Sequence, residues 1–192
     1  IARKSGHRWR SPLESPKRPV LNPTKPELRK AILAKRQSLT AGEVELRSQQ
    51  ILKQLLANAA VLLPAHYASI ALYSPIRGEV DTRPFHAHFQ QQGKRLLFPL
   101  VVGNLPLEFH EVADFAQLRG GSFGIGEPLP VAGTASQRPD VILTPGIAFT
   151  ENAFRLGFGA GHYDRTAAQL LEDGRRAKTR FIGLAYDFQL VP

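Results

Sequence analysis

The chain of 192 residues contains no cysteine. A protein without thiols cannot form a disulfide framework, a thiolate zinc site or an iron–sulfur cluster, and it cannot use a cysteine nucleophile. Long apolar runs are also missing: no stretch approaches the roughly 18 uninterrupted apolar residues of a membrane-spanning helix, so we expect none. Methionine is absent even from position 1, so we expect the sequence not to be a complete, unprocessed reading frame.

The rest of the composition is that of an ordinary globular protein, with 43% hydrophobic and 21% charged residues. The length suits one domain with short additions. The formal net charge is +9, but it is unevenly distributed. Residues 1–24 alone carry a net +5, which leaves +4 for the remaining 168 residues. A mildly basic body suits an anionic small ligand as well as it suits nucleic acid.

The first 24 residues differ in composition from the rest of the chain. They contain four prolines and show neither a helical nor an alternating apolar period. We therefore expect residues 1–24 to be a basic, proline-rich and poorly ordered arm, followed by one folded domain over residues 25–192. A targeting peptide is the alternative, because the arm contains arginine and serine and almost no acid, although its prolines disfavour an amphipathic helix.

Capping signals predict where the first two helices begin. Thr24 is a suitable N-cap, and Pro26 and Glu27 suit a first helical turn. Thr40 and Glu43 form a capping box ahead of a second apolar-periodic segment. Two further helices are expected over residues 81–92 and 163–172.

Short apolar runs predict the strands. Four of them have the texture of buried strands: residues 67–73, 95–101, 140–144 and 180–185. Residues 107–112 alternate in the manner of an edge strand. Apolar strands that alternate with helices indicate an α/β protein, and we expect a three-layer Rossmann-like fold with a mostly parallel central sheet flanked by helices. Ligands of such sheets bind beyond the carboxyl ends of the strands.

The segment richest in chemistry is Arg155–Arg165, where Gly157, Gly159 and Gly161 alternate just before an expected helix. Glycine lets backbone amides approach an oligophosphate closely. The N-terminus of the following helix adds unpaired N–H donors and partial positive charge. The pattern therefore indicates a phosphate-binding loop, with a glycine-rich strand-to-helix turn that binds nothing as the alternative.

Charged side chains accompany these glycines. Arg155 and Arg165 can hold phosphate oxygens in bidentate pairs. Asp164 is a hard oxygen ligand of the kind that holds magnesium on nucleotide phosphates. Two familiar motifs do not fit: a dinucleotide fingerprint that begins at Gly157 would need glycine in place of His162, and no Gly-Lys-Ser/Thr phosphate loop occurs.

Pro145–Phe149 and Arg155–Arg165 together resemble the signature of the 5-formyltetrahydrofolate cyclo-ligase family, with His162 in place of a tyrosine. The resemblance extends over residues 25–191. Its other landmarks, in chain order, are Lys25, Leu28, Arg29, Tyr73, Gly78–Thr82, Gly93–Arg95, Phe98–Leu100, Phe123–Ile125, Glu127, Pro128 and Gly183–Gln189.

This resemblance implies an ATP- and magnesium-dependent conversion of 5-formyltetrahydrofolate to 5,10-methenyltetrahydrofolate, with release of ADP and phosphate. In the family the formyl oxygen is taken to attack the γ-phosphate, after which the neighbouring nitrogen of the folate closes on the activated carbon. Such a reaction depends on positioning and charge stabilisation more than on proton transfer. The missing nucleophile motif therefore agrees with it.

The resemblance also implies site residues. The expected catalytic residues are Arg155 and Glu79. The expected ATP-binding residues are Lys25, Arg29, Arg155, Leu156, Gly157, Phe158, Gly159, Ala160, Gly161, His162 and Tyr163. The expected substrate-binding residues are Ser74, Glu79, Phe158, Gly159, Ala160, Gly161 and His162. Asp164 is the expected magnesium ligand.

Two other functions remain open at this point. A nucleic-acid-binding module could use the basic arm, although no stacked aromatic–basic motif or recognition-helix pattern supports it. An ATP-dependent phosphotransferase with a different acceptor would share the phosphate loop and lack the folate pocket. With the cyclo-ligase reading we expect a cytoplasmic monomer whose partners are ATP and 5-formyltetrahydrofolate, and which binds neither membrane nor nucleic acid.

Overall fold

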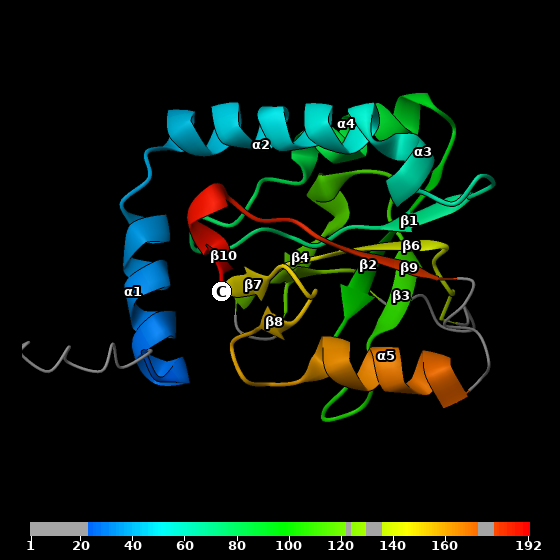
Figure 1. The fold of residues 1–192 in the computed structure, drawn as a ribbon. Coiled ribbons are helices and arrows are strands. Elements are labelled where there is room, and N and C mark those ends of the chain that lie inside the picture. The colour runs from blue at the N-terminus through cyan, green and yellow to red at the C-terminus, as the bar shows by residue number, and fades with distance from the viewer. Residues whose placement is uncertain (1–22, 122–123, 130–135, 173–178) are drawn as a thin grey trace, which may run out of the picture.

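The protein is described here from a computed structural model that covers residues 23–121, 124–129, 136–172 and 179–192. The expected arm therefore lies outside the described residues except for Pro23 and Thr24. The centre of the molecule is a five-stranded sheet in the order β3-β2-β1-β6-β9 (Figure 1). Its strands are β1 Ser69–Ala71, β2 Arg95–Leu100, β3 Glu108–Glu111, β6 Val141–Thr144 and β9 Arg180–Gly183. Neighbouring strands run parallel except for β2 and β3.

Helices and two small sheets surround this centre. The α-helices are α1 Lys25–Gln37, α2 Ala41–Ala57, α3 Ala59–Leu62, α4 Arg83–Gln91 and α5 His162–Glu172. One small sheet has the order β10-β7-β8 and consists of Leu190–Val191, Ala148–Thr150 and Arg155–Leu156. The other pairs β4 Arg119–Gly120 with β5 Gly126–Glu127. Short 3-10 turns lie at Phe115–Gln117 and Asp187–Gln189.

The predicted capping box at the start of α2 is present, and Thr24, the predicted N-cap of α1, forms a second one with Glu27. The Glu27 carboxylate accepts hydrogen bonds from the backbone and the hydroxyl of Thr24 at 2.8 and 2.6 Å. Glu43 does the same for Thr40, whose hydroxyl accepts the Glu43 backbone N–H in return. These bonds satisfy amide groups that have no partner within the first turn of a helix. The starts of α1 and α2 were therefore predicted correctly from side-chain chemistry.

Each expected strand is present, and β3 is an edge strand as predicted. The strand expected over 67–73 is shorter, because the chain leaves the sheet where the Tyr73 carbonyl accepts the Thr82 hydroxyl. The strand expected to be buried over 180–185 lies at the other sheet edge, and its two end residues, Arg180 and Gly183, are exposed. An apolar run alone does not distinguish an edge from a centre.

The two faces of the central sheet pack against different helices, which lie above and below it in Figure 1. Ile70, Leu96 and Leu143 belong to the core that contains Leu55 of α2 and Phe89 of α4. Their sequence neighbours Ala71, Leu97 and Ile142 belong instead to the core that contains Leu170 of α5. Because both faces are covered, the inner strands are continuously apolar instead of alternating. Among the described residues, no helix is long and apolar enough to cross a membrane.

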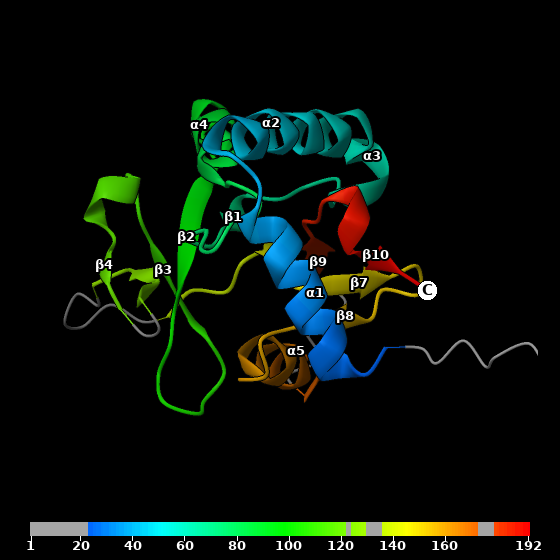
Figure 2. The ribbon, with the colours of Figure 1, turned by 90° about the vertical axis from the view of Figure 1, so that its left-hand side faces the viewer.

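The strand order creates a crevice. From β1 the chain passes through α4 to β2 on one side, whereas from β6 it passes through α5 to β9 on the other. The chain therefore leaves the adjacent carboxyl ends of β1 and β6 in opposite directions. Open α/β sheets bind ligands at such a point. Helix α1 lies across this end of the molecule and packs on the small sheet of β7, β8 and β10 (Figure 2).

Candidate functional site

The loop that follows β1 forms one wall of the crevice. Arg77 and Gly78 both have left-handed backbone conformations, with φ of 49° and 70°. A Cβ atom at position 78 would lie 2.6 Å from the carbonyl oxygen of Arg36, so only glycine fits here without displacing α1. The turn delivers Glu79 to a buried position.

Glu79 is a buried carboxylate with internal partners. Its Oε2 accepts the backbone N–H of Ile76 at 3.1 Å, and its Oε1 lies 3.5 Å from Nη2 of Arg36. Burial raises the pKa of Glu79, and the positive charge of Arg36 opposes this rise. The carboxylate therefore has a charge partner before any ligand arrives, and that partner comes from α1.

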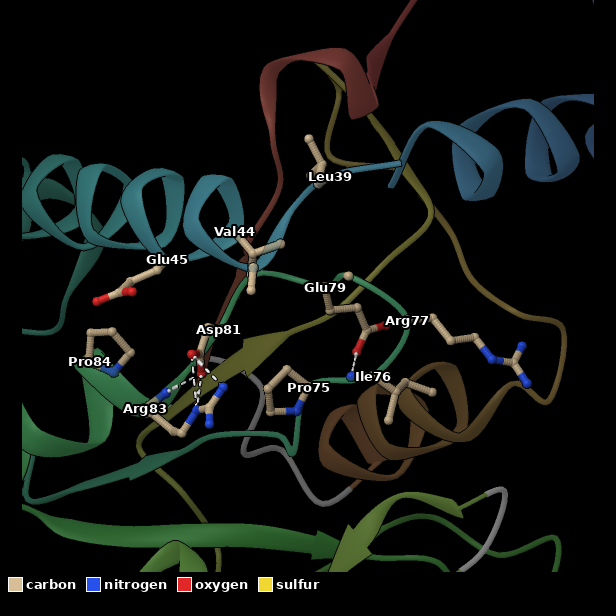
Figure 3. Close-up of a pocket in the computed structure, with 12 residues that line it drawn as sticks. Leu39, Val44, Glu45, Pro75, Ile76, Arg77, Glu79, Asp81, Arg83 and Pro84 are labelled. Carbon is tan, nitrogen blue, oxygen red and sulfur yellow. Dashed lines mark hydrogen bonds and ion pairs between the residues drawn. The ribbon is translucent and has the colours of Figure 1, made fainter. Parts of the chain in front are cut away.

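Glu79 also lines a cleft of about 580 Å³. The cleft lies between the first residues of α2, the loop over 75–79 and the first residues of α4 (Figure 3). Its lining residues are Leu39, Ala41, Val44, Glu45, Pro75, Ile76, Arg77, Gly78, Glu79, Asp81, Arg83 and Pro84. Such a volume suits part of a small organic ligand.

Ser74, which we expected beside Glu79, faces another element. It is half-buried, and a Cβ atom at Gly126 of β5 would lie 2.9 Å from its hydroxyl oxygen. Ser74 is not among the residues that line the cleft with Glu79. The structure therefore places the two predicted substrate residues in one loop and does not bring their side chains into one contact.

The glycine loop between β8 and α5 forms the opposite wall. Gly159 and Gly161 have φ of 112° and 71°, which L side chains rarely adopt. No atom lies within 4 Å of a Cβ built at Gly159. Gly159 and Ala160 are exposed, so the backbone at the middle of the loop is accessible to a ligand.

Arg155 and Asp164 form an ion pair across this loop. Nη2 of Arg155 donates to Oδ1 of Asp164 at 2.7 Å, and the Arg155 guanidinium lies 5.3 Å from the Tyr163 ring centre. The Arg155 side chain is 17% exposed, whereas that of Asp164 is 74% exposed. A cation and an anion that we expected to act on the same nucleotide are thus adjacent, and Asp164 remains accessible from solvent.

The donor set fits a magnesium ion that arrives with phosphates. In the described part of the chain, no group of three or more histidine or acidic side chains could hold a metal ion. Asp164 offers one exposed carboxylate beside the glycine loop. Magnesium on nucleotides is commonly held by one or two carboxylates together with phosphate oxygens and water. Asp164 fits that role only with the phosphates present.

Helix α1 contacts the glycine loop directly. Nε of Arg29 donates to the Gly157 carbonyl at 2.9 Å. The donor is Nε, so this bond involves neither of the two terminal amino groups of the guanidinium. Lys25, one turn earlier at the first position of α1, is exposed. Helix α1, whose Lys25 and Arg29 we expected to bind ATP, thus contacts the glycine loop.

The glycine loop also meets the loop after β1. The Phe158 ring centre lies 5.6 Å from the guanidinium carbon of Arg77 and 5.9 Å from that of Arg36. The ring is nevertheless 44% exposed. Phe158 therefore stands where the two walls of the crevice approach each other.

His162 and Tyr163 begin α5. Nδ1 of His162 lies 2.9 Å from Nη2 of Arg165, so this nitrogen is placed to accept. Nε of Arg165 is buried and has no hydrogen-bond partner within the described residues. Burial raises the pKa of the Tyr163 phenol, and the charge of Glu79 adds to the rise. The charge of Glu79, on the loop after β1, thus acts on a side chain at the start of α5.

Leu156 has a structural position, although we expected it to bind ATP. It pairs with Ala148 in the small sheet and packs against α1 residues, including Ile32. Its backbone carbonyl accepts the N–H of Ile147 at 2.8 Å. Leu156 thus holds the start of the glycine loop against α1.

Arg36 is the residue that sequence reasoning missed. It is fully buried and donates to carbonyl groups in the loop after β1 and in the loop after β6. A signal was present, because Arg36 stands four residues after Ile32 and therefore shares its buried helix face. An arginine on an apolar helix face requires internal partners.

Comparisons with known proteins agree with this geometry. Residues 22–192 match the model of the 5-formyltetrahydrofolate cyclo-ligase family. The chain is 31% identical over 169 residues to the 5-formyltetrahydrofolate cyclo-ligase of Escherichia coli K12, covering 83% of this chain and 86% of that protein. It is 32% identical over 166 residues to the Mycoplasma pneumoniae enzyme of that name, with 84% and 85% covered.

Solved structures show the same likeness. The NMR structure of Aquifex aeolicus 5,10-methenyltetrahydrofolate synthetase superposes with a TM-score of 0.67 at 36% identity, covering 88% of this chain and 82% of that chain. A 5,10-methenyltetrahydrofolate synthetase from Mycoplasma pneumoniae gives 0.65 at 29% identity, with 88% of each chain covered. The family match spans both walls of the crevice, from α1 to the end of the described chain. The chain belongs to the 5-formyltetrahydrofolate cyclo-ligase family.

Proposed function

We propose that the crevice between the loop after β1 and the glycine loop is where this chain carries out its family's reaction. That reaction is the ATP-dependent conversion of 5-formyltetrahydrofolate to 5,10-methenyltetrahydrofolate, with release of ADP and phosphate. The observation that supports this location is that α1, the loop after β1 and the glycine loop meet at the carboxyl ends of β1 and β6. Arg29 of α1 contacts the glycine loop, and Phe158 of that loop approaches Arg77.

The chemistry explains why the site needs charge and order instead of a nucleophile. The formyl oxygen attacks the γ-phosphorus of ATP, and the bond from that phosphorus to the β–γ bridging oxygen breaks to release ADP. The secondary amine nitrogen next to the pterin ring then attacks the activated formyl carbon and loses its proton, while the carbon–oxygen bond breaks and phosphate leaves. Catalysis of such transfers consists mainly of positioning and of stabilising negative charge.

On the ATP side, we assign phosphate contacts to α1 and the glycine loop. The assigned set is Lys25, Arg29, Arg155, Leu156, Gly157, Phe158, Gly159, Ala160, Gly161, His162 and Tyr163. Two features support it: the exposed backbone near Gly159, and the N-terminus of α5 directly behind the loop. Arg155 would neutralise charge that develops on the transferring phosphoryl group.

Magnesium supplies charge neutralisation on the phosphates when it is bound, and Asp164 is the residue that would hold it. The Asp164 carboxylate that would hold the ion accepts a hydrogen bond from Arg155, so the proposed metal ligand and the proposed phosphoryl-binding cation lie side by side.

On the folate side, we assign Glu79 as the residue that orients the substrate. A buried carboxylate can accept hydrogen bonds from the N–H groups of a pterin ring. Ser74 and the loop residues 158–162 complete the assigned set, with Ser74 the member whose side chain faces away from the cleft. We also propose that the chain acts as a monomer in the cytoplasm. The helices on both sheet faces support a three-layer Rossmann-like fold.

The substitution Glu79→Gln tests this assignment. Losing a charge-assisted hydrogen bond costs about 1.5–3 kcal/mol, so the KM for 5-formyltetrahydrofolate should rise about 10- to 100-fold. The KM for ATP should change far less. Product formation is followed by the near-ultraviolet absorbance of 5,10-methenyltetrahydrofolate. Glu111→Gln, on the exposed edge strand β3, is the matched control. An unchanged KM for the folate would remove Glu79 from the site.

A further inference from the structure

Arg36 is a fully buried arginine outside the predicted site. It lies near the end of α1, with 0% of its surface exposed. The cost of burying a guanidinium is high unless hydrogen bonds and an opposite charge compensate for it. Its partners therefore indicate what the residue does.

Those partners lie in two loops, the one after β1 and the one after β6. Nη2 donates to the carbonyls of Ile76 and Arg77 at 3.1 and 2.9 Å, and Nε donates to Arg77 at 3.1 Å. Nη1 donates to the Gly146 carbonyl at 3.2 Å, in the loop that follows β6. One planar guanidinium thus fixes the loop after β1 against the loop after β6. Lysine could not reproduce this fork of donors.

The same guanidinium provides charge for Glu79. Oε1 of Glu79 lies 3.5 Å from Nη2 of Arg36, and both side chains are buried. The other charged group that acts on Glu79 is Arg77 on the same loop, and the charge of Glu79 in turn raises the pKa of the Tyr73 and Tyr163 phenols. Burial raises the pKa of Glu79, and Arg36 is the largest influence that lowers it.

We infer that Arg36 is a positioning residue of the reaction: it fixes the loop over 76–79 across the crevice and keeps the Glu79 carboxylate ionised for the folate. This inference rests on the proposed role of Glu79. It adds a residue that acts through Glu79 and that does not itself contact ATP. Its loss should therefore affect the folate side and the pH dependence, and not the nucleotide side.

Three variants separate the two effects. Arg36→Lys keeps a positive charge and loses the fork, Arg36→Met loses both, and Lys30→Met removes an exposed charge from the same helix as a control. Each is compared with the unmodified full chain by kcat and KM for both substrates over a range of pH. Calorimetric binding of 5-formyltetrahydrofolate without ATP gives a readout independent of turnover, and a thermal scan checks folding.

For Arg36→Lys we expect the KM for 5-formyltetrahydrofolate to rise about tenfold, with the KM for ATP within about twofold. For Arg36→Met we expect in addition that the acidic limb of kcat/KM for the folate moves to higher pH, because unpaired Glu79 takes up a proton more readily. In a Glu79→Gln background, Arg36→Met should move this limb no further. Lys30→Met should behave as the unmodified chain.

Either of two results overturns the inference: a folded Arg36→Met variant whose acidic limb coincides with that of the unmodified chain, or an Arg36→Lys variant with unchanged KM for the folate. If Arg36→Met does not fold, Arg36→Lys decides alone. Failure of the proposed function is distinguishable, because the unmodified chain would then form no 5,10-methenyltetrahydrofolate at all. If the unmodified chain is active and the Arg36→Lys variant has the same KM for the folate, only the inference about Arg36 is contradicted.

Discussion

The Asp164 carboxylate occupies an unusual position, because one oxygen binds Arg155 at 2.7 Å while most of the side chain faces solvent. An exposed ion pair of this kind stabilises a fold by only about 0–1 kcal/mol. If Asp164 were only a stabilising residue, its replacement would therefore leave turnover nearly intact. The metal role and the stabilising role therefore predict different results.

For Asp164→Asn we expect turnover to fall about tenfold or more and the magnesium concentration for half-maximal rate to rise, because the amide is a poorer ligand than the carboxylate. Unfolding free energy should change by no more than about 1 kcal/mol. Steady-state rates over a magnesium series measure the first effect, and urea unfolding measures the second. Glu172→Gln, at the exposed end of α5, is the control. A stable Asn variant with unaltered magnesium dependence would exclude Asp164 from the site.

His86 gives a prediction about stability. Its ring is buried in α4, 5.2 Å from the ring centre of Phe115, and its Nε2 has no hydrogen-bond partner among the described residues. Burial lowers its pKa from the usual 6.5. The unfolded chain therefore binds the proton at a pH where the folded chain does not, so stability is complete above pH 6.5 and falls as the pH drops below it.

The substitution His86→Phe should remove this part of the pH dependence, because phenylalanine keeps the aromatic packing and does not titrate. Urea unfolding at several pH values between about 5 and 7.5 measures it. His66→Gln, at an exposed position, should keep the slope of the unmodified chain. A His86→Phe variant with the full original slope would show that His86 is not its source.

At this scale the sequence predicted residue types better than residue partners. The glycine loop, Arg155 and Asp164 could be named because glycines beside charges are a local pattern. The 2.7 Å contact between Arg155 and Asp164 could not be predicted, because it depends on the backbone path through Gly159 and Gly161. Ser74 lies near Glu79 in the sequence, while its hydroxyl faces Gly126, and this too depends on the backbone path.

At the scale of elements, α1 contacts the glycine loop through a hydrogen bond from Arg29 to the Gly157 carbonyl. We expect Arg29→Ala to raise the KM for ATP about tenfold, because it removes both a phosphate-facing cation and the anchor of the loop. Adding Lys25→Ala should raise it further, and the KM for the folate should change less. Lys30→Ala is the control on the same helix. An Arg29→Ala variant with unaltered KM for ATP contradicts the ATP role of α1.

Elements with local signals were predicted well, and short elements were not. Capping boxes mark α1 and α2 because their hydrogen bonds involve residues three apart in the chain. The small sheet of β7, β8 and β10 was missed, because strands of two or three residues are too short to show a period. That sheet supports α1 over the glycine loop, so its absence from the prediction also hid the partner of α1.

For the whole molecule, strand order is the feature that the sequence did not contain. The prediction of a mostly parallel sheet was correct because apolar strands alternate with helices. The position of β1 between β2 and β6 depends on the direction of each crossover, which no local pattern encodes. This strand order brings Glu79 and the glycine loop to one crevice. From the sequence, the two could be assigned to one site only through the resemblance to a family.

The N-terminal residues give a test of the rival function. The chain lacking residues 1–22 keeps Pro23 and the cap Thr24, so α1 should form as before. We expect its kcat and both KM values to equal those of the full chain. A nucleic-acid-binding module would instead lose most of its affinity and its salt dependence with these basic residues. Loss of turnover together with loss of salt-dependent nucleic-acid binding would favour the rival.

The central claim is that ATP phosphorylates the formyl oxygen at this site. A reaction with 5-formyltetrahydrofolate that carries heavy oxygen in the formyl group tests it most directly, with mass analysis of the phosphate released. If the formyl oxygen attacks the γ-phosphorus, we expect each molecule of 5,10-methenyltetrahydrofolate to be accompanied by one ADP and one phosphate that contains the label. Product formed together with unlabelled phosphate would show that the formyl oxygen leaves by another route, and would contradict the account.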